Sequence, residues 1–187
     1  MRAVRNNIPR MATLLLGLGL LSAVASLAKV PMITPGGELP KLRGERLSGR
    51  SIVLPDSARG SSLLLLLGFT YESRHDVEAW AERFHRDFAQ DSKIMCYEIP
   101  VIGGAARLAR PFIDGGMRRG TPRALHERVV TVYRDAGEWK QRVGFSERDV
   151  AYLLLVDGEG RVVWRAQGPF GEERYRLLAE HVRDLPR

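Results

Sequence analysis

Hydrophobic and polar positions alternate with two different periods along the chain. Residues 63–67 are five consecutive leucines closed by Gly68, a pattern typical of a central strand buried on both faces. Residues 73–90 then repeat their apolar side chains at helical spacing, which predicts a helix with one face packed on that strand. Ser73, followed three residues later by Asp76, predicts the N-cap of this helix. Together the two segments predict a strand-to-helix unit.

The same two periods predict the other elements. A short hairpin is expected over 39–62, strands over 93–101 and 129–133, and a second hairpin over 151–165. Helices are expected around 138–143 and at the C-terminal end, where Tyr175, Leu178, Ala179, Val182 and Leu185 share one face. Between 104 and 128 the pattern predicts two short helices, broken by Pro111, by Gly115-Gly116 and by 120–122. The order predicts an α/β fold: a three-layer sandwich in which a central mixed sheet carries helices on both faces, preceded by an N-terminal β-hairpin.

The first 28 residues have the pattern of a targeting segment. Residues 1–10 carry three arginines and no acidic residue, and residues 11–28 carry no charge. This predicts a signal peptide or an N-terminal membrane anchor over 1–28, a linker over 29–40 and one domain over 41–187. The domain is then exported, either periplasmic or anchored to the inner membrane and facing outside. A mitochondrial presequence, leading to the inner membrane, is the alternative.

Composition and charge narrow the classes of function. A hydrophobic share of 44% and a charged share of 27% are those of a globular protein. The net charge is +7, and without the three leader arginines it is 7 − 3 = +4. That surplus does not indicate nucleic-acid binding, although it fits a mild attraction to an anionic membrane surface. Cys96 is the only cysteine, so the chain has neither an intramolecular disulfide nor a CxxC motif.

Four segments together resemble the thioredoxin-like, peroxiredoxin-like superfamily. They are LPKLRGERLSGRSIVLP, LLLLLGFTYESRHDVEAW, VYRDAGEWKQRVGF and AYLLLVDGEGRVVWRAQG. The resemblance implies that the turn after the first core strand corresponds to the position of the redox cysteine pair. That turn here holds Tyr71, Glu72, Ser73, Arg74 and His75, none of which can form a disulfide. Redox-active relatives also place a cis-proline before the strand that here begins at Ala151, where this chain has Arg148, Asp149 and Val150.

Two segments resemble a narrower group, the mitochondrial ATP synthase assembly factors and their bacterial relatives. These segments are YEIPVIGGAARLARPFIDGGMRRG and AYLLLVDGEGRVVWRAQGP. The resemblance implies a non-catalytic chaperone or assembly factor, without a cofactor, for a membrane-embedded subunit of an energy-coupling complex.

Residues 110–120 form the most unusual local sequence and are the predicted partner-binding site. Its members are Arg110, Phe112, Asp114, Gly115, Gly116, Met117, Arg118 and Arg119. Arginines can grip carboxylates or phosphates, glycines let a partner approach the backbone, and Phe112 with Met117 adds an adaptable apolar contact. The hypothesis is that this segment docks an acidic or amphipathic helix of a partner. A structural turn between two helices explains the same residues equally well.

Cys96 is the weak catalytic candidate. It lies in the middle of a predicted strand, where a lone cysteine is usually a small buried hydrophobic residue without a helix N-terminus to activate it. No metal site is expected, because His75 and His85 lie ten residues apart on the predicted helix, nearly three turns. The sequence therefore predicts a redox-inactive thioredoxin-fold binding protein that helps a membrane complex to assemble. The alternative is a one-cysteine thiol oxidoreductase or peroxidase that uses Cys96.

Overall fold

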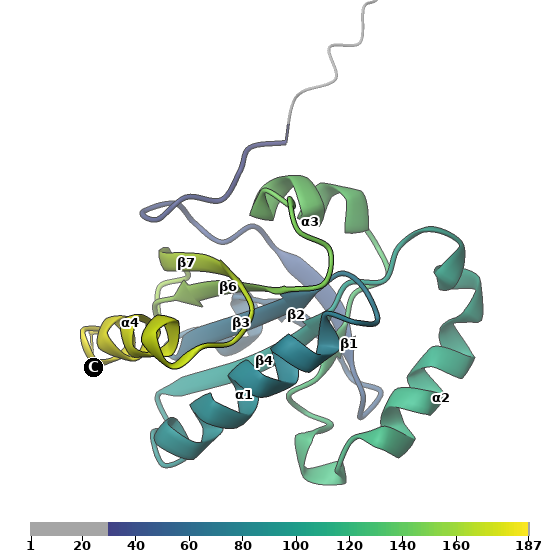
Figure 1. Cartoon of the computed structure of the whole chain (residues 1–187), viewed down its shortest axis with the longest axis horizontal. Coiled ribbons are helices and arrows are strands. Elements are labelled where there is room, and N and C mark those ends of the chain that lie inside the picture. The colour runs from purple at the N-terminus through teal and green to yellow at the C-terminus, as the bar shows by residue number, and fades with distance from the viewer. Residues whose placement is uncertain (1–29, 187) are drawn as a thin grey trace, which may run out of the picture.

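The computed structural model describes residues 30–186, and it is built around a mixed β-sheet (Figure 1). The strands are β1 (Leu42–Arg46), β2 (Ser51–Leu54), β3 (Ser62–Gly68), β4 (Ile94–Pro100), β5 (Val130–Thr131), β6 (Ala151–Val156) and β7 (Val162–Gly168). Four of them are paired in the order β4-β3-β6-β7, with β3 parallel to β4 and antiparallel to β6. The other three are paired in the order β2-β1-β5. Two parallel bridges, Glu98 with Val129 and Val101 with Val132, join β4 to the β5 segment and link the two sheets.

Helices cover both faces of the sheet and make three layers. The helices are α1 (Arg74–Phe88), α2 (Arg110–Gly120), α3 (Ala136–Val143) and α4 (Glu172–Arg183), with 3₁₀ turns at Asp56–Ala58, Gly104–Ala109 and Arg123–Leu125. One core cluster packs α1 and α4 on the sheet, and the other packs α3 on the opposite face. Figure 1 shows α2 at one end of the molecule, away from both layers. The predicted α/β sandwich with its N-terminal hairpin is confirmed.

Strand β3 is buried on both faces, as its sequence predicts. Leu63 to Leu67 have no exposed surface. Leu64 and Leu66 point to the α1 and α4 side, while Leu63, Leu65 and Leu67 point to the α3 side. The strand therefore supplies both cores and fixes where α1 begins.

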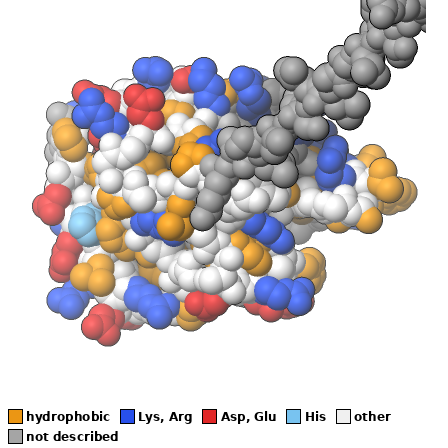
Figure 2. Space-filling view, turned by 90° about the horizontal axis from the view of Figure 1, so that it is seen from above, with side chains coloured by type: hydrophobic (Ala, Val, Ile, Leu, Met, Phe, Trp, Pro, Cys, Tyr) orange, Lys and Arg blue, Asp and Glu red, His pale blue; other side chains and the backbone are white. Residues whose placement is uncertain are grey.

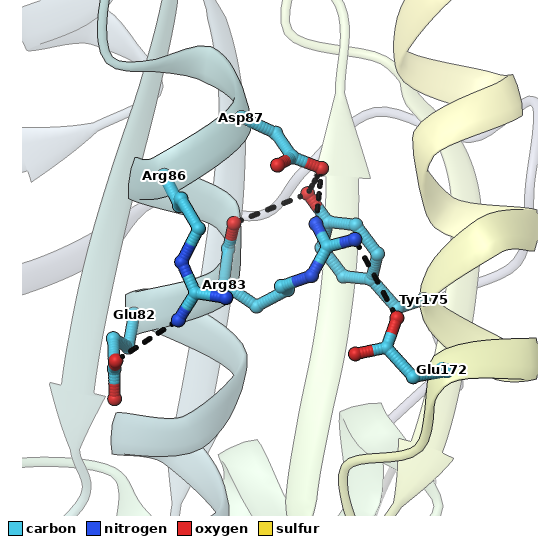
Figure 3. A network of polar contacts seen from close by, with 6 residues as sticks. All are labelled: Glu82, Arg83, Arg86, Asp87, Glu172 and Tyr175. Carbon is cyan, nitrogen blue, oxygen red and sulfur yellow. Dashed lines mark hydrogen bonds and ion pairs between the residues drawn. The ribbon is translucent and has the colours of Figure 1, made fainter.

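A polar network ties α1 to α4 at their outer surface (Figure 3). The Tyr175 hydroxyl donates to Asp87 Oδ2 at 2.9 Å, and Arg83 pairs with both Asp87 and Glu172. The Arg83 guanidinium carbon also lies 4.3 Å from the centre of the Tyr175 ring. The hydrogen bond from Tyr175, together with Arg83, lowers the pKa of Asp87 against a smaller opposing effect of burial. The charged surface hollow that these residues line is therefore explained by the contact between α1 and α4.

The segment 104–128 differs from the sequence prediction in one respect. Gly115 and Gly116 lie inside α2 and do not break it, and neither has a positive φ. Pro111 sits in the first turn, where a missing N–H leaves no hydrogen bond unmade. The helix ends at Gly120, as predicted. The glycine pair is tolerated because the contacts made by its neighbours, described below, hold the helix in place.

The segment expected to be a linker packs against the domain from Ile33 onward. Ile33 is 5% exposed, and its N–H donates to Arg142 O at 2.7 Å. Arg165 Nη1 donates to Ile33 O at 2.6 Å, and Leu39 N–H donates to Gly160 O at 2.9 Å. The predicted leader over 1–28 and residue 29 lie outside the described residues. Among the residues that are described, no helix is both long and apolar enough to cross a bilayer.

Candidate functional site

The turn between β3 and α1 is closed by a pair of reciprocal hydrogen bonds. Thr70 Oγ1 accepts from Ser73 N–H at 3.1 Å, and Ser73 Oγ accepts from Thr70 N–H at 3.2 Å. Ser73 stands immediately before the first residue of α1, Arg74, so the predicted N-cap position is confirmed. Its hydroxyl does not bond to an N–H of the first helical turn but donates to Thr70 O at 2.8 Å. The side chains of Thr70 and Ser73 therefore close the turn that leads into α1.

The loop before β6 meets this turn directly. Thr70 Oγ1 lies 2.8 Å from Asp149 Oδ1 and 3.2 Å from Arg148 O, and its single proton is donated to one of them. Within 30–186 the one cis peptide bond precedes Pro55, so the bonds from Arg148 to Val150 are trans. The resemblance implies that redox-active relatives have a cis-proline beside a cysteine pair at this place. This chain instead has a hydrogen bond from the Thr70 hydroxyl to the loop before β6.

An aromatic cluster packs against the loop before β6. Phe69, Phe145 and Tyr152 lie with their ring centres 5.3 to 5.7 Å apart. The Tyr152 hydroxyl accepts from Ser146 N–H and Glu147 N–H, each at 2.9 Å, and it also lies 2.9 Å from Glu147 O. These contacts fix the loop, so the surface next to the turn is preorganised.

The turn itself presents polar and aromatic side chains to solvent. Tyr71 is 69% exposed, and the Arg74 guanidinium carbon lies 4.0 Å from the centre of its ring. His75 Nε2 lies 4.0 Å from Glu72 Oε2, and both side chains are exposed. Ser73, the remaining residue of the predicted redox-motif position, is fully buried. The four exposed side chains can bind a partner through stacking, charge and hydrogen bonds, but they offer no sulfur for disulfide exchange.

Cys96 lies in β4, away from this turn. It is 1% exposed and belongs to the core cluster beneath α1, facing the same way as Ile94. Burial raises the pKa of the Cys96 thiol well above its ordinary value, and the nearby Glu98 raises it further. A thiol held neutral and away from solvent is a poor nucleophile.

Glu98 is a half-buried carboxyl that sequence analysis missed. It follows Cys96 by two residues in β4, so it faces α1 on the same side of the sheet. Burial, together with the charge of Glu78, raises the pKa of Glu98 to about 7. A polar residue at an inward position of an otherwise apolar strand was the available clue.

Several residues of the predicted partner-binding site hold α2 to the domain. Asp114 is 6% exposed and accepts from the Tyr133 hydroxyl at 2.6 Å and from Arg110 Nε at 3.3 Å. Arg110 Nη2 lies 2.5 Å from Glu45 Oε2. Arg118 Nε donates to Leu47 O at 2.8 Å. These three members of the predicted site thus have structural partners within the chain.

Other members of the predicted site face solvent. Phe112 is 83% exposed, Gly116 and Arg119 are exposed, and Gly115 and Met117 are half-buried. Leu108, four residues before Phe112, is 88% exposed. We call residues 104–123 the arm. The contacts of Arg110, Asp114 and Arg118 hold its inner side to the domain, and its outer side is exposed to solvent, where a partner can reach it.

Comparison with known proteins matches the chain to solved structures. A thioredoxin domain of a thiol-disulfide oxidoreductase from Bacteroides vulgatus is 18% identical, with a TM-score of 0.57, over 80% of this chain and 99% of that one. BsSco, a member of the Sco family of cytochrome c oxidase assembly proteins, is 14% identical, with a TM-score of 0.58, over 82% and 96%. The fold is thioredoxin-like. A peroxiredoxin-like protein from Aquifex aeolicus shares this thioredoxin-like fold at 13% identity and a TM-score of 0.52, over 80% and 88%. Neither family models nor curated proteins gave a match.

Proposed function

We propose that this chain is a redox-inactive thioredoxin-fold binding protein that acts at a membrane, where it helps a protein complex to assemble. The observation that carries the proposal is the chemistry of the turn after β3. The fold's redox position holds an exposed tyrosine, arginine and histidine and a hydrogen bond from Thr70 to the neighbouring loop. The one thiol of the chain is buried elsewhere. Such a site can hold a partner but cannot exchange disulfides.

The contact surfaces that we propose are the exposed turn and the outer side of the arm. Tyr71 and Arg74 form a stacked pair that a protein partner could cover without disturbing the core. The charge pattern of residues 1–28 supports export, to the periplasm or to the outer side of an inner membrane. One of the similar structures is itself named as an assembly protein, for cytochrome c oxidase. An ATP synthase as the target rests on the sequence resemblance alone.

A second candidate function, thiol chemistry, is favoured by the names of several similar structures. They are described as a putative protein disulfide isomerase, a putative thiol:disulfide interchange protein, a thiol-disulfide oxidoreductase and a peroxiredoxin-like protein. In this chain it would require Cys96. Insulin reduction and peroxide consumption with a thiol donor, measured for wild type and Cys96→Ser, separate the two candidates. We expect no turnover that depends on Cys96. Clear Cys96-dependent turnover would replace the binding function with the thiol function.

Partner binding is tested by capture from detergent-solubilised membranes of the source cells. We expect the full chain to retain a membrane protein and the Tyr71→Ala, Arg74→Glu double variant to lose it. Arg176→Glu on α4, a charge reversal at an exposed arginine remote from the turn, is the matched control. Equal retention by all three proteins would refute the turn as the contact surface.

A further inference from the structure

We infer that the outer side of the arm binds the surface of an anionic phospholipid bilayer, with Leu108 and Phe112 entering the headgroup region and arginines meeting the phosphates. The inference rests on the proposed function, because it names what the arm meets when the protein works at a membrane. It leaves the turn after β3 for the protein partner.

The charge of the arm is the first argument. From residue 99 to residue 126 the chain contains one acidic residue, Asp114, and that carboxylate is buried against Tyr133. Arg107, Arg119 and Arg123 are exposed and form no ion pair within residues 30–186. The arm therefore presents positive charge that nothing in the described domain neutralises. Arginine guanidinium groups bind phosphate oxygens in a bidentate manner, and basic residues near an anionic leaflet are attracted to it.

The exposed apolar side chains are the second argument. Leu108 and Phe112 are the two most exposed large hydrophobic residues of the described chain, and they lie four residues apart across the start of α2. Ala105, Ala109 and Gly116, small residues of the same segment, are also exposed. At the end of the molecule where Figure 1 places α2, Figure 2 shows hydrophobic side chains projecting beside basic ones. Bulky apolar residues among arginines are the composition of helices that lie in a membrane interface.

The shape of the arm favours a lipid surface over a partner helix. A helix that docks on a protein uses three or more apolar anchors in a groove. The arm offers two large anchors on a projecting surface, and it lines neither the hollow beside Pro55 and Gly160 nor the one between α1 and α4. The contacts of Arg110, Asp114 and Arg118 hold the inner side of the arm, so Leu108 and Phe112 are kept facing outward.

The experiment measures whether Phe112 enters the bilayer. The full chain with Phe112→Trp is reconstituted with vesicles of phosphatidylcholine alone, or with added phosphatidylglycerol, each with brominated acyl chains that quench nearby tryptophan. Trp80 and Trp139 are buried, and wild type measured in parallel gives the background from all three native tryptophans. Leu177→Trp, at an exposed position on α4, is the matched control for residues brought close by the rest of the chain.

We expect strong quenching of Phe112→Trp in vesicles that contain phosphatidylglycerol, and little in phosphatidylcholine alone or at high salt. Leu177→Trp should not be quenched. Adding Arg107→Glu, Arg119→Glu and Arg123→Glu should abolish the quenching at position 112 while the folded circular dichroism spectrum is retained. Each of these results supports the lipid contact.

Absent quenching at position 112, or quenching that survives charge reversal, would overturn the inference. If a photo-crosslinker at position 112 instead joins the chain to a protein in native membranes, the arm is a protein-docking surface and the lipid contact is refuted, while the proposed function stands. Cys96-dependent turnover would remove the proposed function and is measured without vesicles. The two failures are therefore distinguishable.

Discussion

Replacing Glu98 by glutamine should change how stability depends on pH. In the folded chain the pKa of Glu98 is raised to about 7 from an ordinary 4.5, because burial and the charge of Glu78 disfavour the carboxylate. Between these two values the folded state holds a proton that the unfolded state releases. Stability due to this carboxyl is therefore complete below pH 4.5 and is lost as the pH rises through 7.

The pKa values set the size of the effect. Moving the pKa of one carboxyl from 4.5 to about 7 corresponds to about 3–4 kcal/mol at most. Glu98 keeps some contact with solvent, which screens part of that energy, so we expect Glu98→Gln to be more stable than wild type by ~1–3 kcal/mol at pH 8. At pH 4.5 the neutral acid and the amide are close in shape, and the difference should nearly vanish.

The assay is urea unfolding followed by circular dichroism at intervals from pH 4.5 to 8. Burial and Arg128 lower the pKa of His85, which reduces stability as the pH falls, but this effect does not involve Glu98, is common to both proteins and cancels in the difference. Glu82→Gln, on the exposed side of α1, should follow wild type at every pH. Parallel curves for wild type and Glu98→Gln would refute the reasoning that the Glu98 carboxyl is protonated in the folded protein at neutral pH.

Three further substitutions test how the arm and the turn are held. Asp114→Ala should lower the free energy of unfolding by ~2–4 kcal/mol, because it leaves the Tyr133 hydroxyl without its acceptor; a loss under 1 kcal/mol would show that the arm is not fixed there. Gly116→Ala should raise stability by ~0.5–1 kcal/mol, since an added Cβ meets no atom within 4 Å and the site is inside a helix; destabilisation in the same urea assay would contradict the helix. Thr70→Val should cost ~1–2 kcal/mol and speed amide exchange of residues 148–150, and unchanged exchange would refute the hydrogen bond to Asp149.

Elements with strong periodicity could be predicted from the sequence. The strand formed by the leucine run and the apolar face of α1 follow from the spacing of apolar residues alone, because each of these side chains packs against the nearest layer of the core. The helical course of α2 through Gly115 and Gly116 does not. It depends on Asp114 reaching Tyr133 and on Arg118 reaching Leu47, contacts between residues 19 and 71 positions apart.

The candidate site shows the same division. That the turn lacks the cysteine pair is evident from the sequence, since no residue there carries sulfur. The position of the helix N-cap at Ser73 could be predicted, but not that its hydroxyl bonds to Thr70, because that contact depends on the backbone geometry of the turn. The roles of Arg110, Asp114 and Arg118 were also hidden, because an arginine that grips a partner and one that grips its own fold look alike in a sequence.

The segment from Ile33 to Leu39 is a structural part of the domain. Its backbone hydrogen bonds join it to α3, to β7 and to the turn before β7. A truncation that begins after residue 40 would therefore remove the backbone partners of Arg142, Gly160 and Arg165 and expose the apolar surface that Ile33 and Leu39 cover.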